Sequence, residues 1–132
     1  MKTRSQNYAE RAWGCVHPLH PDASLLVASS DAKDYRSHAM SLPVMILQCG
    51  LAQTVAFVQH KGVEDKSYRE WLEHLHLVLD KAGSNFVSDS RTVGVMDYML
   101  LTRQALEAAS WLKRYAEALI PASEELRGGS HA

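Results

Sequence analysis

The sequence predicts an all-α protein, a single-domain helical bundle of about five to seven helices. Apolar residues recur at spacings of three and four, which is typical of amphipathic helices, and no stretch shows the alternation of a strand. The four prolines and seven glycines cluster between these periodic segments. A chain of 132 residues is long enough for one domain with its own core. We expect the domain to span residues 1–122 and residues 123–132 to form a flexible C-terminal tail.

The first helix is expected over residues 5–16. Residues 3–6 have the sequence of a capping box, which satisfies free backbone N–H groups at a helix start. His17-Pro18 ends this helix, and residues 17–30 form a connection. Within the connection, residues 25–27 (Leu-Leu-Val) are either a pinned loop or a short helical turn.

The second and third helices are expected over residues 31–49 and 51–59, separated by Gly50. Asp31 is the expected N-cap of the second helix, and Pro43 is expected to kink it because proline lacks an N–H and crowds the preceding turn. The third helix is apolar on nearly all sides, which predicts a central place in the core. The apolar stripe of the second helix consists of Tyr35, Ala39, Leu42, Ile46 and Cys49.

The fourth helix follows a turn at residues 60–63. A second capping box at residues 67–70 begins it, and we expect it to end at Ala82 with Gly83 as its C-terminal cap. Residues 84–96 are predicted to be a polar connection without regular structure.

The last helix, residues 98–119, carries the strongest periodic signal. Its apolar seam alternates steps of three and four and ends at Pro121. Three acidic residues lie on it or immediately before it, and we expect them to form ordinary ion pairs along the helix surface. The acidic residues are Asp97, Glu107 and Glu117, and the seam consists of Tyr98, Leu101, Ala105, Ala108, Leu112, Tyr115 and Leu119.

Charge and cysteine content narrow the class of protein. Fourteen basic and fifteen acidic side chains give a net charge of -1, which excludes a strongly basic nucleic-acid binder but not a local basic face. No apolar run approaches the ~20 residues of a membrane span, so we expect a cytoplasmic protein. Cys15 and Cys49 are separate thiols among apolar neighbours, and both are expected to be small buried side chains.

The sequence shows no recognisable catalytic or metal motif. There is no nucleophile elbow, zinc-protease motif or phosphate-binding loop. The close histidine pairs are His17 with His20 and His74 with His76, and residues two apart on a helix point to different faces. We therefore expect solvated or capping histidines, no metal and no cofactor.

Basic residues are the best candidates for a functional surface. Residues 103–115 carry three positive side chains and one negative, so the last helix has a local positive excess. Two glutamines flank the break at Gly50, where amides can cap helix ends or contact a partner's backbone. The candidates for nucleic-acid contact are Lys33, Arg36, Gln48, Gln53, Lys61, Lys113 and Arg114.

Three ordered motifs carry a resemblance to a known family. Residues 35–57 run from Tyr-Arg-Ser to Leu-Pro-Val-Met-Ile-Leu-Gln-Cys-Gly-Leu-Ala-Gln-Thr-Val-Ala-Phe, and residues 98–119 include Trp-Leu-Lys-Arg-Tyr-Ala-Glu-Ala-Leu. Together with Glu10-Arg11-Ala12, these stretches resemble the small subunit of the type III-B CRISPR Cmr effector complex. The chain has Cys49 where that family usually carries asparagine before the glycine.

The resemblance implies an all-helical, non-catalytic subunit of a ribonucleoprotein. Its implied partners are the backbone and large subunits, further copies of itself in the minor filament, and the guide RNA–target RNA duplex. Three alternatives stay open. They are the small subunit of the type III-A complex, a homodimeric helical adaptor that self-associates through the seam at 98–119, and a helical hydrolase or metal-dependent phosphatase. The enzyme would use His17, His20 and His74 together with acidic residues.

Overall fold

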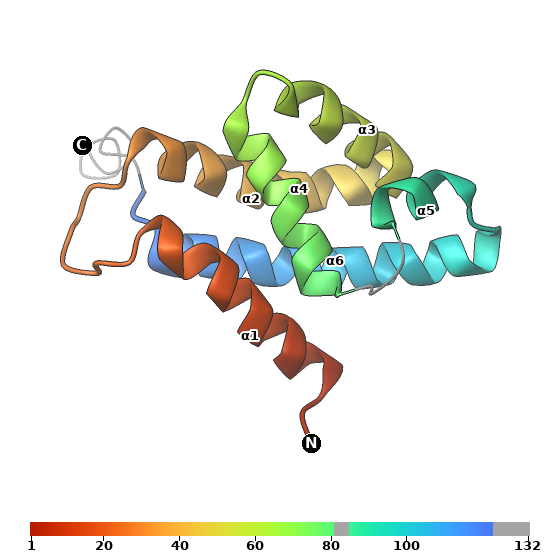
Figure 1. Cartoon of the computed structure of the whole chain (residues 1–132), viewed down its shortest axis with the longest axis horizontal. Helices are drawn as coiled ribbons and strands as arrows, with labels where there is room; N and C mark the ends of the chain where they lie inside the picture. The colour runs from red at the N-terminus through yellow and green to blue at the C-terminus, as the bar shows by residue number, and fades with distance from the viewer. Residues whose placement is uncertain (81–84, 123–132) are drawn as a thin grey trace.

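Two long antiparallel helices, α2 and α6, lie side by side and form the base of the fold (Figure 1). Helix α4 crosses both of them, α1 packs against α6 and α4, and α3 packs against α4 and α5. The computed structural model describes residues 1–80 and 85–122, and its elements are α1 (Arg4–Val16), the 3-10 turn η1 (His17–Leu19), α2 (Ser30–Cys49), α3 (Leu51–Gly62), α4 (Lys66–Leu79), α5 (Phe86–Thr92) and α6 (Val95–Leu119). The predicted all-α class is confirmed, and the described residues contain no strand.

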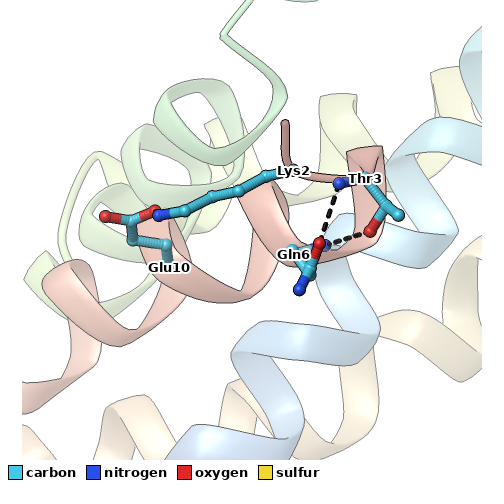
Figure 2. A network of polar contacts seen from close by, with 4 residues as sticks. All are labelled: Lys2, Thr3, Gln6 and Glu10. Carbon is cyan, nitrogen blue, oxygen red and sulfur yellow. Dashed lines mark hydrogen bonds and ion pairs between the residues drawn. The ribbon is translucent and has the colours of Figure 1, made fainter.

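The capping box at the start of α1 is confirmed (Figure 2). The Thr3 hydroxyl accepts a hydrogen bond from the Gln6 backbone N–H at 3.1 Å, and the Gln6 side chain accepts one from the Thr3 N–H at 2.9 Å. Lys2 extends along the helix surface to an ion pair with Glu10. Because two free N–H groups are satisfied locally, the sequence alone is sufficient to locate this helix start.

Helix α2 has its N-cap two positions before the predicted one. Ser29 is the N-cap, and its hydroxyl accepts from the Ala32 N–H at 3.1 Å. Asp31 instead lies in the first turn, where a carboxylate interacts favourably with the positive end of the helix dipole. The helix continues through Pro43 without a break. The predicted stripe is buried as far as Ile46.

Cys49 is exposed, so its predicted burial is wrong, whereas Cys15 is half-buried. The stripe leaves the core at Cys49 because the chain turns at Gly50 into α3. Gly50 has φ of +89°, a conformation that favours glycine. The Tyr98 hydroxyl of α6 accepts a hydrogen bond from the Ala52 N–H at 3.1 Å, which fixes the start of α3.

Helix α3 is longer and less buried than predicted. It continues to Gly62, so residues 60–62 are helical rather than part of a turn. One face, including Leu51, Val55 and Val58, is buried, but Ala56 is exposed. The apolar circumference therefore does not place this helix at the centre of the bundle, because its outer side has no covering element among the described residues.

Helix α4 is capped differently from the prediction. Asp65 is the N-cap, and its carboxylate accepts from the Ser67 N–H at 3.0 Å and from the Ser67 hydroxyl. Ser67 therefore lies inside the helix and does not start a capping box. The helix ends at Leu79, where Asp80 adopts a left-handed conformation. The predicted end at Ala82 and cap at Gly83 fall outside the described residues, as does the predicted tail.

Helix α5 lies where the sequence predicts only a polar connection. Asn85 is its N-cap and accepts from the N–H groups of Val87 and Ser88. Phe86 is fully buried at the start of this helix. A helix of seven residues is too short to show a repeating apolar pattern, so only packing against α3 and α6 reveals it.

The seam of α6 is confirmed as the centre of the core. The helix begins at Val95, and the middle of the seam is almost completely buried against α1 and α2. Tyr98, Tyr115 and Leu119 at the ends of the seam are half-buried. Since the chain itself covers the seam, it does not provide the self-association surface of the adaptor alternative. The buried residues of the whole helix α6 are Leu101, Ala105, Ala108, Ala109, Leu112 and Ala116.

A polar pair formed by buried Tyr35 and half-buried His74 joins α2 to α4. The Tyr35 hydroxyl lies 2.7 Å from His74 Nδ1, and Tyr35 is fully buried. Burial raises the pKa of Tyr35 well above its usual value, so the hydroxyl keeps its proton and needs an acceptor. The unprotonated Nδ1 supplies it. Burial also lowers the pKa of His74, with nearby Glu73 opposing the shift.

The lowered pKa of His74 predicts a pH dependence of stability. The unfolded chain binds a proton on this histidine near pH 6.5, whereas the folded chain binds it only at lower pH. The free energy of unfolding should therefore decrease as the pH falls below about 6.5, until the folded-state pKa is passed. Denaturation of the wild type and of His74→Gln at several pH values measures this contribution. Parallel pH profiles for the two proteins would contradict it.

The helices within the described part of the chain include none that is long and apolar enough to cross a membrane.

Candidate functional site

The Arg36 side chain forms contacts within the protein itself. Its Nε donates to the Ile120 carbonyl at the C-terminal end of α6, at 3.1 Å, and Nη1 lies 3.3 Å from Met40 Sδ. A helix C-terminus presents free carbonyl groups, and a guanidinium there satisfies one of them. The structure thus gives Arg36 a structural contact, which joins the first half of α2 to the end of α6.

Four candidate residues lie at one end of the α2–α6 pair. Lys33 is one turn before Arg36, and Arg36 contacts the end of α6. Arg114 precedes Ile120 by six positions, which is about 9 Å along the helix axis. The start of α2 lies beside the end of α6 (Figure 1). Lys33 and Arg36 near the start of α2 are therefore at the same end of the helix pair as Lys113 and Arg114.

The cations at this end lack acidic partners. Lys2 and Arg4 of α1 form ion pairs with carboxylates, and Lys66 pairs with Asp31 at the start of α2. Among residues 1–80 and 85–122, no carboxylate lies within ion-pair distance of the candidates Lys33, Lys61, Lys113 and Arg114. Their charge is therefore available to an external anion.

The acidic residues Glu107 and Glu117 of α6 do not form the predicted ion pairs along the helix surface. Glu107 pairs with Arg4 of α1, at 3.0 Å, and so joins two helices. Glu117 lies beside Lys113 and Arg114 but forms no ion pair with a described residue. The positive excess near the end of α6 is consequently not cancelled by pairing along the helix.

Lys61 is connected to α2 through a row of aromatic rings. Its ammonium lies 5.8 Å from the centre of the Phe57 ring. Phe57 meets the edge of Tyr68, with ring centres 5.8 Å apart, and Tyr68 stacks on His38 of α2 at 3.7 Å. This row spans α3, α4 and α2, so it fixes the end of α3 that carries Lys61.

Gln48 and Gln53 lie away from the end of the α2–α6 pair that carries Lys33, Arg36, Lys113 and Arg114, which we call the basic end. Both are exposed on either side of the turn at Gly50. Gln48 follows Lys33 by fifteen positions on one helix, which corresponds to about 22 Å along its axis. The structure therefore divides the seven candidates and leaves the two amides at the opposite end of α2 from Lys33.

Sequence reasoning overlooked the aromatic residues beside the basic end. A groove on α6 is lined by Trp111 and Tyr115 together with Lys113 and Arg114. The sequence places Tyr115 in the seam and in a family motif, and Trp111 in that motif, but it names neither as a candidate for RNA contact. The spacing of four between two aromatic residues flanking adjacent cations is the signal that could have identified this groove.

Several histidines contribute to the fold rather than remaining solvated. His20 is buried, with Nε2 at 2.8 Å from the Leu25 carbonyl, and His74 accepts from Tyr35 as described above. His17 stacks on Trp13, with ring centres 4.3 Å apart. Over the described ranges, no three side chains of His, Cys, Asp or Glu come together in a group that could bind a metal ion.

Comparisons with known proteins all indicate the same family. The family model described as CRISPR-associated protein (Cas_Cmr5) matches residues 4–119. A protein of Thermus thermophilus named CRISPR system Cmr subunit Cmr5 is 34% identical over 122 residues, covering 91% of this chain and 98% of the relative. The protein of the same name from Thermotoga maritima is 31% identical over 129 residues, covering 94% of this chain and 90% of the relative.

A solved structure shares the fold. The crystal structure of a CRISPR-associated Cmr5 family protein from Thermus thermophilus superposes with a TM-score of 0.75 at 35% identity. The similarity covers 91% of this chain and 99% of the solved one. The match to the family model, the two relatives and the shared fold confirm the resemblance found in the sequence motifs, and they show that this chain belongs to the Cmr5 family of CRISPR-associated proteins.

Proposed function

We propose that this protein is a non-catalytic subunit of a cytoplasmic type III-B CRISPR Cmr complex and helps hold the guide RNA–target RNA duplex. The observation that carries the proposal is the basic end of the α2–α6 pair, where Lys33, Lys113 and Arg114 have no carboxylate partner among the described residues. Membership of the Cmr5 family supports assembly with other Cmr subunits.

The basic end is suited to RNA phosphates. Phosphate contacts depend on charge and displace bound counterions, so they need no sequence-specific geometry. Lys33, Lys113 and Arg114 supply the charge, while Arg36 fixes the two helices relative to each other through Ile120. Lys61 is a further candidate on α3, and Gln48 and Gln53 are uncharged candidates at the distant turn.

Exposed apolar side chains support contacts with protein partners. At the start of α6, Val95 and Met96 are 71% and 76% exposed, and Leu47 on α2 is 72% exposed. Exposed apolar residues that lie together commonly form interfaces. We assign these surfaces to the backbone and large subunits and to further copies of the same chain in the minor filament.

The basic end is tested by replacing Lys113 and Arg114 with alanine. Target-RNA affinity of the assembled complex should fall, and the slope of log affinity against log salt should become shallower by about 1.5 for each copy. Filter binding at several salt concentrations measures both quantities. Lys2→Ala with Arg4→Ala is the matched control, because it also removes one lysine and one arginine, and these are already paired with Glu10 and Glu107.

Each outcome of this experiment is informative. Unchanged affinity and slope would contradict the RNA contact at Lys113 and Arg114. Failure of the variant to assemble would place the pair at a protein–protein interface, since long basic side chains also cover apolar surfaces of neighbours. An equal loss in the control variant would mean that only overall charge matters.

The alternative functions can be distinguished from the Cmr subunit by separate measurements. Sedimentation of the isolated chain distinguishes the Cmr subunit, expected as a monomer or weakly associating species, from a stable homodimeric adaptor. Metal analysis of the purified protein tests the hydrolase alternative, which requires stoichiometric metal. The family match favours the Cmr complex over the type III-A complex.

A further inference from the structure

The C-terminal half of α6 carries a surface groove of about 590 Å³. It is lined by two aromatic rings, two cations and one acid, in addition to small side chains. The charged and aromatic lining residues are Trp111, Lys113, Arg114, Tyr115 and Glu117. Because all five belong to one helix, the helix fixes the relative positions of their backbones.

The two aromatic residues present prepared ring surfaces. Trp111 and Tyr115 stack with ring centres 5.8 Å apart and an angle of 25° between their planes. Both are half-buried and pack against the core, so part of each ring is anchored while the rest lines the groove. Such anchored rings lose little conformational freedom when a flat ligand stacks on them.

We propose that this groove binds the unpaired bases of a single RNA strand, with Trp111 and Tyr115 as the stacking surface and Lys113 and Arg114 on the flanking phosphates. The inference rests on the proposed function and goes beyond it: in addition to the guide RNA–target RNA duplex, Lys113 and Arg114 contact a stretch of strand whose bases are unpaired. A cationic groove with aromatic rings is the arrangement that sequence-tolerant single-strand binding uses. In a duplex, the base faces are covered by neighbouring pairs and do not reach such rings.

The balance of charge favours RNA over a protein segment in this groove. Two cations face one carboxylate, and neither cation is paired with a described acidic residue. Glu117 repels phosphates from its own position, so the backbone of the strand is expected to follow Lys113 and Arg114.

The test replaces the rings while keeping the charges. Trp111→Leu combined with Tyr115→Leu retains apolar volume against the core but removes both π-surfaces. Binding of a fluorescent single-stranded oligouridine and of an RNA duplex to the full chain is measured by anisotropy at low ionic strength. Loss of one stacked base corresponds to a decrease in single-strand affinity of about 5- to 150-fold.

Two further variants are needed as controls. Trp111→Phe with Tyr115→Phe keeps aromatic faces and should bind the single strand nearly as well as the wild type, which remains informative if the leucine variant unfolds. Trp13→Leu removes a tryptophan of α1 that is 45% exposed and does not line the groove, and it should leave binding unchanged. Duplex affinity and the salt slope should be little altered in all three variants, since the cations remain.

The results separate this inference from the proposed function. If the leucine variant binds the single strand like the wild type, or loses single-strand and duplex binding equally, stacking in the groove is contradicted. If Lys113→Ala with Arg114→Ala still weakens RNA binding in that case, the proposed function stands alone. If neither pair of substitutions affects RNA and a protein subunit of the complex protects the groove instead, both assignments fail.

Discussion

Replacing Leu112 by alanine is expected to lower the free energy of unfolding by about 2–5 kcal/mol. Leu112 is 0% exposed in the middle of α6, whose inner face packs against α1 and α2. Removing its side-chain atoms forfeits their burial and leaves a cavity that surrounding helices fill only in part. Chemical denaturation of the purified chain measures the loss.

Leu100→Ala provides a control on the same helix. Leu100 is 48% exposed, so the same substitution there should change the free energy of unfolding by no more than about 0.5 kcal/mol. Leucine-to-alanine substitution changes the intrinsic helix propensity by the same amount at both positions. The difference between the two losses of unfolding free energy therefore reports burial. Equal losses at the two sites would mean that the inner face of α6 is assigned incorrectly.

Replacing His74 by alanine is expected to lower the free energy of unfolding by about 1–3 kcal/mol. The substitution removes the acceptor of the Tyr35 hydroxyl, whose side chain is fully buried between α2 and α4. A buried donor without a partner costs its full desolvation, whereas removing both partners costs less. Denaturation at about pH 8.5, well above the usual histidine pKa, measures the effect without a contribution from protonation of His74.

The Tyr35–His74 coupling is isolated by a double-mutant cycle. Tyr35→Phe removes the donor, and the combined variant should lose less stability than the sum of the two single losses. Additive effects would show that the 2.7 Å contact contributes nothing of its own. A loss below about 0.5 kcal/mol for His74→Ala would be the behaviour of a solvated histidine.

The helices that the sequence predicted well are those with local or repeated signals. The start of α1 depends on Thr3 and Gln6, which contact each other within one turn. The seam of α6 repeats over many turns, so its burial follows from its spacing. Helix α5 has neither property, and Phe86 is buried only because other helices surround it.

The candidate surface was predictable in residue type but not in arrangement. The sequence identified Lys113 and Arg114 as part of a positive excess, but offered no reason to separate them from Gln48 and Gln53. It also could not show that Arg36 donates to Ile120, because the two residues are 84 positions apart in the chain. Contacts at this separation depend on how helices pack, which helical periodicity does not encode.

The sequence by itself determined the all-α class, the main helices and the motifs of the Cmr5 family, because apolar spacing and local capping operate within a few turns. Only the tertiary structure decided which side chains at the helix surfaces meet. It exposed Cys49 at the turn to α3, paired Glu107 with Arg4 of another helix, and brought the start of α2 to the end of α6. Each of these outcomes depends on the packing of distant segments, where many weak contacts act together and no short stretch of sequence specifies the result.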